Sequence, residues 1–188
     1  MRRLIVTEFV SLDGVMEAPG GEPGYVHSGW VGDFFSDELG AYKLDEQLAT
    51  DILLLGRMTY EGFYGAWPSR EGPFADKING MPKYVASTTL TALEWETASL
   101  LEGPVPDAVA ELKQQDGGPI LVAGSRTLVQ SLLEAGLVDE LNLQVFPLLL
   151  GSGMRLFPET PDKTALELVS SKALHNGVLL QTYKPAAA

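Results

Sequence analysis

Leu54-Leu55-Gly56-Arg57-Met58-Thr59-Tyr60 marks the place where a short apolar run, typical of a buried strand, turns into a helical pattern. Glycine lets a backbone approach a ligand closely. The N-terminus of the helix that follows offers unpaired N–H groups and the positive end of the helix dipole. Arg57 adds a fork of donors that suits phosphate. The stretch therefore predicts an anion site at the carboxyl end of a strand; the alternative is an ordinary turn with a surface arginine.

Two further strand ends carry residues of the same kind. Ser87-Thr88-Thr89 follows an apolar run, and its hydroxyls can bind a phosphate or cap a local turn. Ala123-Gly124-Ser125-Arg126-Thr127 follows another run and opens a helix, although the full G-x-G-x-x-G pattern is absent. The carboxyl ends of parallel strands lie at one edge of a sheet. The three junctions together therefore predict a site for a ligand with more than one phosphate.

Strands and helices are expected to alternate along most of the chain. Strands are predicted over 4–10, 52–55, 83–86, 93–97, 119–122, 139–146, 165–175 and 178–184, and helices over 34–49, 59–66, 105–112 and up to about 135. Ser36 is the expected N-cap of the first helix, with Leu44 and Leu48 as an apolar pair. Asn176-Gly177 is a strong hairpin signal. The pattern predicts an α/β fold with a mixed, mainly parallel central sheet, helices on both faces and a C-terminal antiparallel hairpin.

Composition narrows the classes of function. The 188 residues suit one domain over 1–185, followed by a frayed tail at 186–188. A net charge of −12 disfavours nucleic-acid and anionic-membrane partners. The absence of cysteine excludes disulfides and thiolate chemistry, and no His, Asp and Glu residues have metal-ligand spacing, so no metal is expected. No signal peptide or membrane span is evident, and a cytoplasmic protein is expected.

The order and spacing of these pieces resemble the dihydrofolate reductase-like superfamily. The resemblance is greatest to the branch that holds the reductase domain of bacterial riboflavin biosynthesis and its stand-alone relatives, and it covers nearly the whole chain. The matching pieces are Ser11-Leu12-Asp13-Gly14-Val15, residues 54–60, Val85-Ala86-Ser87-Thr88-Thr89, residues 119–125, Leu137-Val138-Asp139-Glu140-Leu141 through Pro147, and Gly151-Ser152-Gly153 to Leu156-Phe157.

The resemblance implies a three-layer fold with about eight strands that binds NADPH along the sheet edge. It places the pyrophosphate and the adenosine-side phosphate on Gly56, Arg57, Met58 and Thr59, and the 2′-phosphate and adenine on Ser87 and Thr88. The pyrophosphate and nicotinamide half would meet Ala123, Gly124, Ser125, Arg126, Thr127 and Leu128. The nicotinamide would lie near Val6, Thr7, Met16, Gly20 and Gly21. Ala123 departs from the glycine pair usual in the family.

A carboxylate is expected to orient the substrate or relay a proton. Asp13 is the first candidate by resemblance to the riboflavin branch, followed by Glu38 and then Asp37 in the first helix. The helix carboxylate of dihydrofolate reductases has no clear match. The alternative for Asp13 is a turn residue, because Asp13-Gly14 is a good turn dipeptide.

The implied activity is NADPH-dependent hydride transfer to a small heterocyclic substrate, pyrimidine- or pteridine-like, or to a carbonyl compound. It is similar to that of 5-amino-6-(5-phosphoribosylamino)uracil reductase. A true dihydrofolate reductase and a non-catalytic NADP-binding or regulatory protein are the alternatives. The family also implies a homodimer formed through the late strands, for which Leu148-Leu149-Leu150 could serve as interface or as core.

Overall fold

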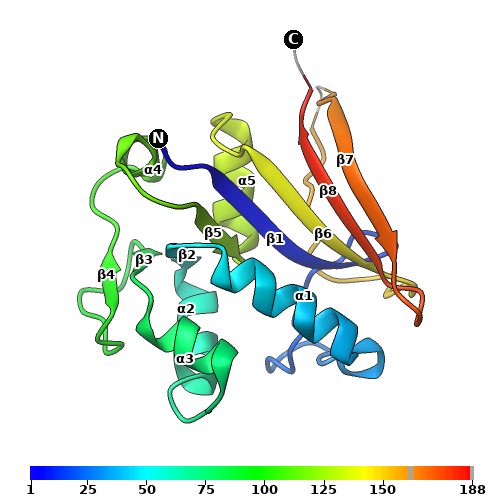
Figure 1. The fold of residues 1–188 in the computed structure, drawn as a ribbon. Coiled ribbons are helices and arrows are strands. Elements are labelled where there is room, and N and C mark those ends of the chain that lie inside the picture. The colour runs from blue at the N-terminus through cyan, green and yellow to red at the C-terminus, as the bar shows by residue number, and fades with distance from the viewer. Residues whose placement is uncertain (161–162, 187–188) are drawn as a thin grey trace.

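The computed structural model describes residues 1–160 and 163–186. One sheet runs through the molecule in the order β4-β3-β2-β5-β1-β6-β8-β7 (Figure 1). Its strands are β1 (Leu4–Ser11), β2 (Ile52–Gly56), β3 (Lys83–Ala86), β4 (Ala98–Leu100), β5 (Ile120–Ala123), β6 (Glu140–Phe146), β7 (Leu166–Ala173) and β8 (Leu179–Pro185). The first six pair in parallel, and β8 pairs antiparallel with both β6 and β7. The predicted fold class is confirmed.

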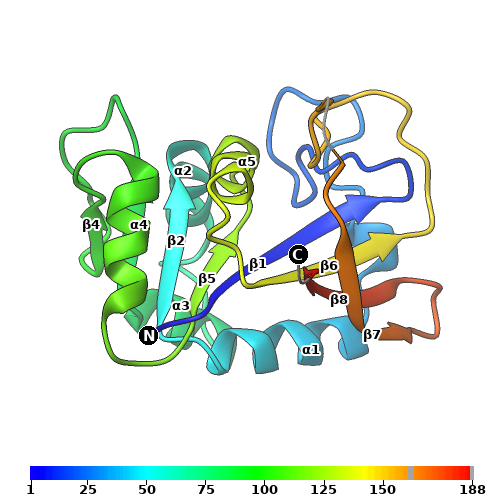
Figure 2. The same cartoon turned by 90° about the horizontal axis from the view of Figure 1, so that it is seen from above.

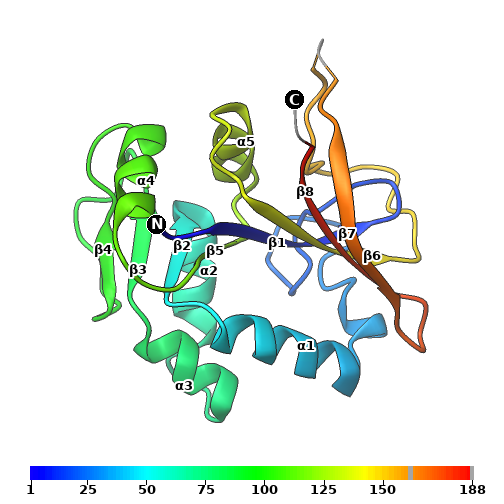
Figure 3. The same ribbon diagram turned by 45° about the horizontal axis from the view of Figure 1, so that its top comes forward.

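Helices cover both faces of the sheet, as predicted. The elements are a short 3₁₀ helix η1 (Gly32–Phe34), α1 (Asp37–Leu48), α2 (Arg57–Ala66), α3 (Pro73–Gly80), α4 (Val105–Gln114) and α5 (Arg126–Glu134). Figure 3 shows α1, α2 and α3 on one face and α4 and α5 on the other. Over the described part of the chain, none of these helices combines the length and the apolar character that a membrane crossing requires.

Strand β1 lies inside the sheet, and its apolar side chains are buried on both faces. Leu4 and Val6 belong to the apolar cluster under α4 and α5, whereas Ile5 belongs to the cluster under α2 and α3. β1 pairs with β5 on one side and with β6 on the other (Figure 2). β2 pairs in parallel with β3 and β5, so the carboxyl ends of β2, β3 and β5 share one edge of the sheet, and they are the ends at which the sequence predicts a ligand.

The hairpin of β7 and β8 forms at Asn176-Gly177, as predicted, with Gly177 at a φ of +87°. All eight residues of β7 are exposed. They include the apolar side chains of Leu166, Leu168 and Val169. Ala186, placed by the sequence in a frayed tail, donates its N–H to the carbonyl oxygen of Ala165 at 3.1 Å, and residues 187–188 lie outside the described residues.

Two predicted elements are wrong in detail. The strand expected at 93–97 forms instead at Ala98–Leu100, because the N–H groups of Glu94 and Trp95 donate to the hydroxyl of Tyr60 rather than to a strand. The first helix begins at Asp37 and not at residue 34, because the Ser36 hydroxyl accepts the N–H of Leu39 and residues 32–34 form η1.

The Leu44 and Leu48 pair predicts which side of helix α1 faces the sheet. In the structure a different side of the helix faces it. Leu48 is 53% exposed, while Gln47 is buried. Lys43 and Glu46 lie toward the sheet with largely buried side chains. The helix therefore packs partly over polar groups, which a search for an apolar stripe does not detect.

Candidate functional site

Two of the three predicted junctions meet through direct hydrogen bonds. The N–H of Gly56, at the end of β2, donates to the Ser125 hydroxyl at 2.7 Å. That hydroxyl donates in turn to Oγ1 of Thr59 in α2, also at 2.7 Å. Since β2 and β5 are neighbours in the sheet, the two loops are held together at its carboxyl edge. Gly56, Thr59, Gly124 and Ser125 form what we call the two-helix cradle.

Both glycines of the cradle are required by close packing. A Cβ on Gly56 would lie 2.8 Å from the Cβ and Oγ atoms of Ser125. A Cβ on Gly124 would lie 3.0 Å from the Thr59 side chain. Gly124 and Ser125 both adopt a φ of +69°. A serine in this left-handed conformation costs about 1 kcal/mol or more, and such strain is concentrated at functional sites.

The cradle joins the N-termini of two helices that no side chain caps. The N-cap residues are Gly56 for α2 and Ser125 for α5, and neither caps its helix through a side chain because the Ser125 hydroxyl is bound across the cradle. First-turn N–H groups and two positive dipole ends therefore point to one place. This arrangement suits an anion with two phosphate groups, such as a pyrophosphate.

Two arginines beside the cradle, Arg57 and Arg126, differ in their partners. Nη1 of Arg57 lies 3.1 Å from Oε2 of Glu61 one helical turn away, and both side chains are more than a third exposed. Such a pair contributes little to stability, so Arg57 can leave Glu61 for a stronger anion. Nε of Arg126 is buried and has no hydrogen-bond partner among the described residues. Arg126 thus offers an unpartnered donor next to the cradle.

The remaining predicted cofactor residues lie around this edge with varied exposure. Met58 and Thr127 are exposed at the starts of α2 and α5, while Leu128 is buried. β3 pairs with β2 so that Ala86 lies opposite Gly56, which places Ser87 at the same edge. The Ser87 hydroxyl accepts the N–H groups of Thr89 and Leu90, so it caps a local turn, and Thr88 is exposed.

The residues expected near the nicotinamide are mostly buried in the protein. Val6 and Met16 belong to the apolar cluster under α5, and the side chain of Thr7 lies on the opposite face under α1. Gly20 and Gly21 are exposed in the long loop after β1. Only the backbone of β1 and this loop could therefore reach a cofactor, and the nicotinamide roles of these residues stay a prediction.

The first two candidate catalytic carboxylates, Asp13 and Glu38, are bound within the protein. Asp13 accepts the Ser11 hydroxyl at 2.6 Å and the N–H groups of Leu150 and Gly151 at 3.1 and 2.8 Å. These bonds, led by the one from Ser11, lower the pKa of Asp13 to about 2, so it is ionised at neutral pH and is a poor proton donor. Its catalytic role stays a prediction.

Glu38, the second candidate, binds the C-terminal hairpin. Its carboxylate lies 2.6 Å from Nζ of Lys172 and 3.4 Å from Nδ1 of His175. The hydrogen bonds from these two residues, Lys172 first, lower the pKa of Glu38. No hydrogen bond or ion pair joins Glu38 to the cradle among the described residues, and a proton relay by Glu38 stays a prediction.

Sequence reasoning missed another carboxyl group, that of Glu8 on β1. Glu8 is only 5% exposed, and its Oε1 atom is buried without a hydrogen-bond partner among the described residues. Burial raises its pKa to about 8; Lys43 and the backbone N–H of Gly124 offset this only in part, and Glu46 adds to it. In the pairing of β1 with β5, Thr7 lies opposite Ala123, so this buried carboxyl group belongs to the residue next to the Gly124–Ser125 turn.

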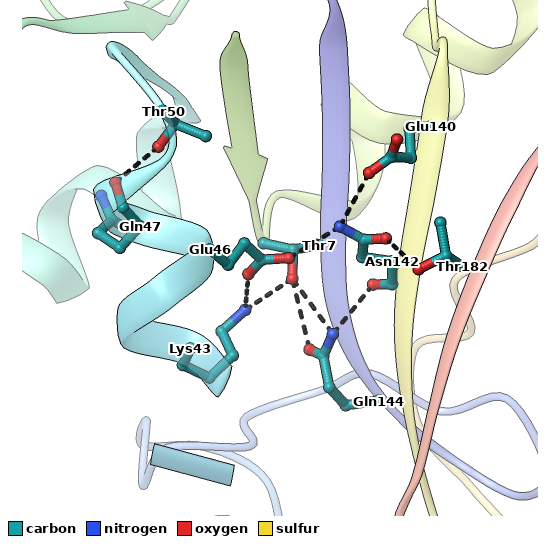
Figure 4. Close-up of polar contacts among 9 residues, drawn as sticks. All are labelled: Thr7, Lys43, Glu46, Gln47, Thr50, Glu140, Asn142, Gln144 and Thr182. Atoms are coloured by element: carbon teal, nitrogen blue, oxygen red, sulfur yellow. Dashed lines mark hydrogen bonds and ion pairs between the residues drawn. The ribbon is translucent and has the colours of Figure 1, made fainter. Parts of the chain in front are cut away.

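A buried polar network lies on the opposite face of β1, under α1 (Figure 4). Nζ of Lys43 donates to Oγ1 of Thr7 at 2.6 Å and lies 2.5 Å from Oε2 of Glu46. Asn142 donates to the other Glu46 oxygen at 3.0 Å, and Gln144 contacts Thr7 at 3.4 Å. The network is satisfied through its own members, so it fixes α1 against the sheet.

A surface hollow of about 550 Å³ lies at the opposite edge of the sheet. It is lined by residues that include Arg2, Asp51, Lys77, Pro82 and Gln115. Because Asp51 and Pro82 directly precede β2 and β3, this hollow is at the amino ends of the strands. It shares no residue with the two-helix cradle.

Comparison with known proteins gives a match over nearly the full chain. A family model described as the RibD C-terminal domain matches residues 2–180. The uncharacterized protein YwjB of Bacillus subtilis strain 168 is 30% identical over 179 residues, covering 95% of this chain and 96% of YwjB. The uncharacterized protein YyaP of the same strain is 27% identical over 187 residues, covering 97% of this chain and 94% of YyaP.

Solved structures share the fold. A protein from Shewanella sp. PV-4, provisionally named a riboflavin biosynthesis protein, has a TM-score of 0.77 at 24% identity, over 98% of this chain and 99% of its own. Dihydrofolate reductase from Enterococcus faecalis, complexed with NADP(H), has a TM-score of 0.63 at 17% identity, over 98% and 97%. A deaminase/5-amino-6-(5-phosphoribosylamino)uracil reductase from Thermotoga maritima has a TM-score of 0.66 at 12% identity, over 98% of this chain and 57% of its own.

Proposed function

The chain belongs to the RibD C-terminal domain family, and we propose that it is an NADPH-dependent reductase of the riboflavin-pathway type. In this proposal it transfers hydride to a small heterocyclic substrate, pyrimidine- or pteridine-like, or to a carbonyl compound. The observation that carries the proposal is the two-helix cradle, in which Gly56, Thr59 and Ser125 join two uncapped helix N-termini. Two structures of the same fold are of reductases, one of them complexed with NADP(H).

The residues of the cradle fit a nicotinamide dinucleotide. The N-termini of α2 and α5 would hold the pyrophosphate, with Arg126 as an additional donor. Arg57 and the hydroxyls of residues 87–89 would hold the 2′-phosphate that distinguishes NADPH from NADH. When bound, the cofactor would supply the hydride, and the protein would orient the nicotinamide toward the substrate.

A non-catalytic NADP-binding protein is the second candidate, and one observation favours it. Asp13 and Glu38 are both engaged in hydrogen bonds or ion pairs within the protein, so neither is free to relay a proton in this structure. Cofactor binding without turnover of pyrimidine, pteridine or carbonyl substrates would favour this candidate over the reductase.

Titration with NADPH and NADH tests the proposal. Energy transfer from the tryptophans to the reduced nicotinamide should report binding of NADPH in the micromolar range or tighter. Arg57→Ala should weaken NADPH about ten-fold or more and NADH much less, because loss of a charged hydrogen bond to phosphate costs about 1.5–3 kcal/mol. Arg3→Ala removes an arginine near the opposite edge and is the matched control.

Other outcomes of this titration have definite meanings. Equal loss of NADPH and NADH on Arg57→Ala would assign Arg57 to the pyrophosphate instead. Failure of the unmodified protein to bind either dinucleotide would overturn the proposed function and the cofactor roles of the cradle residues.

We also propose that two copies of the chain associate through β7. Every residue of this edge strand is exposed, and Leu168 and Val169 are more than half exposed. An edge strand with apolar side chains is open to pairing with another chain. Sedimentation equilibrium at about 10 μM should give a dimer. Val169→Lys should shift the dimer to the monomer. Leu12→Lys, which changes an exposed apolar residue outside β7, should leave the dimer intact. A monomeric unmodified chain would refute the dimer.

A further inference from the structure

Glu8 stands out among the groups that the proposed function does not use. Its carboxyl group is desolvated in the middle of the sheet, between two β1 neighbours that face α5, Val6 and Val10. The pairing of β1 with β5 leads out of this position: Thr7 lies opposite Ala123, so Glu8 lies next to Gly124, the residue that follows β5. A buried carboxyl group with a partnerless oxygen atom is costly, so its position calls for an explanation.

Gly124 is itself a residue of the cradle, so Glu8 lies directly beside the cradle. Gly124 and Ser125 share the left-handed turn that opens α5, and the Ser125 hydroxyl receives the Gly56 N–H and donates to Thr59. A change in charge at Glu8 therefore acts on the turn that holds both helix N-termini in place. The same charge would lie behind the N-terminus of α5, where an anion is expected to bind.

We propose that Glu8 is a positioning residue for the pyrophosphate of the cofactor: its uncharged carboxyl group supports the Gly124–Ser125 turn, and its ionisation opposes binding of an anion at the two-helix cradle. The inference rests on the proposed function. It predicts that dinucleotide binding is coupled to protonation of a group that never touches the cofactor.

The charges around Glu8 are compatible with this role. The groups that act on it are Lys43, which favours ionisation, and Glu46, which opposes it, both on α1 across the sheet. Among the elements packed beside β1, β5 has no charged residue, β6 has Glu140, and α5 has Arg126 and Glu134 at its two ends. Because burial raises the pKa of Glu8 to about 8, its charge changes in a range where phosphate groups stay ionised.

The test is the dissociation constant of NADPH between about pH 7 and pH 9.5. If only the protonated form binds, affinity should be about thirty-fold weaker at pH 9.5 than at pH 7, since the apparent constant scales with the competent fraction. Glu8→Gln has no charge at any pH, and its constant should stay flat. Glu134→Gln, an exposed glutamate at the end of α5, should keep the profile of the unmodified chain.

Binding should also take up protons, because linkage is reciprocal. Calorimetry at pH 8 in buffers of different ionisation enthalpy should show uptake of about half a proton for the unmodified chain and less for Glu8→Gln. Lys83, whose pKa burial lowers to about 8, titrates in the same range but is present in both proteins. A flat affinity profile in the unmodified chain, or equal profiles in both, would overturn the inference.

The failure of the proposed function is distinguishable from the failure of this inference. If NADPH does not bind at any pH, the same comparison is made with inorganic pyrophosphate by calorimetry. The titration of pyrophosphate itself is common to both proteins and is subtracted. If binding then weakens with rising pH in the unmodified chain but not in Glu8→Gln, the role of Glu8 is supported although the proposed function fails. Absence of pyrophosphate binding overturns both.

Discussion

Glu8→Gln should become steadily more stable than the unmodified chain as the pH rises from about 5 to about 8. The free-energy difference between the two proteins should grow by about 1.4 kcal/mol for each pH unit, and so by about 3 kcal/mol between pH 5 and pH 7.5. The amide has nearly the same size and shape as the carboxyl group, so the change removes the ionisation and little else.

The direction of the effect follows from the two states. In the unfolded chain Glu8 ionises near the ordinary glutamate pKa of 4.5, whereas in the folded chain burial holds the pKa at about 8. Between these values the folded protein binds a proton that the unfolded chain has released, so stability falls with rising pH. Above about pH 8 both states are ionised and the difference levels off.

Urea unfolding of both proteins at half-unit steps of pH measures this difference directly. Other groups that titrate, including Asp13 and Lys83, are common to both chains and cancel. A difference that does not change with pH would mean that Glu8 is already ionised in the folded protein. The pH-linked role proposed above would then lose its basis.

Lys43→Met should destabilise the protein by about 3 kcal/mol or more. Removing one partner of a buried ion pair leaves the other charge without compensation, which typically costs about 3–5 kcal/mol. The Glu46 side chain is only 6% exposed, and without Lys43 it keeps the hydrogen bond from the Asn142 amide but no cation of the network. Thr7 would also lose the Lys43 ammonium at 2.6 Å.

A double-mutant cycle with Glu46→Leu separates the pair from its surroundings. The double variant should recover much of the loss, because it removes the unpaired charge. Lys172→Met is the matched control, since Lys172 pairs with Glu38 at a side-chain exposure of 63% and should cost less than about 1 kcal/mol. The free energy of unfolding is measured with urea at pH 6. Equal and small decreases for Lys43→Met and Lys172→Met would show that the network contributes little to stability.

Much of the fold and part of the site could be predicted because their signals are local. The apolar runs and the Asn176-Gly177 turn encode the strands and the hairpin without reference to distant residues. Gly56, Gly124 and Ser125 follow strands directly, and parallel pairing then brings them together. The topology thus brings two weak local patterns into direct contact and places the third at the same edge of the sheet.

The polar interior could not be predicted in the same way. The strand pattern treats Glu8 as one more residue of its run, although a charged residue inside a run that is buried on both faces is itself a usable signal. Lys43 and Glu46 resemble the solvent side of a helix, and only the packing of α1 over β1 shows that they are buried. The sequence favours Asp13 for chemistry, whereas the N–H groups that bind it come from a loop far along the chain.

The central position of β1 also affects how the chain can be made. β1 is synthesised before both of its neighbours in the sheet, which are residues 120–123 and 140–146. Until those segments emerge, an apolar strand has both edges unpaired, and closing such distant contacts is slow because loop entropy is lost before pairing is gained. Fragments that end before β6 would therefore expose β1 to aggregation, and a chaperone that binds nascent chains would find a target there.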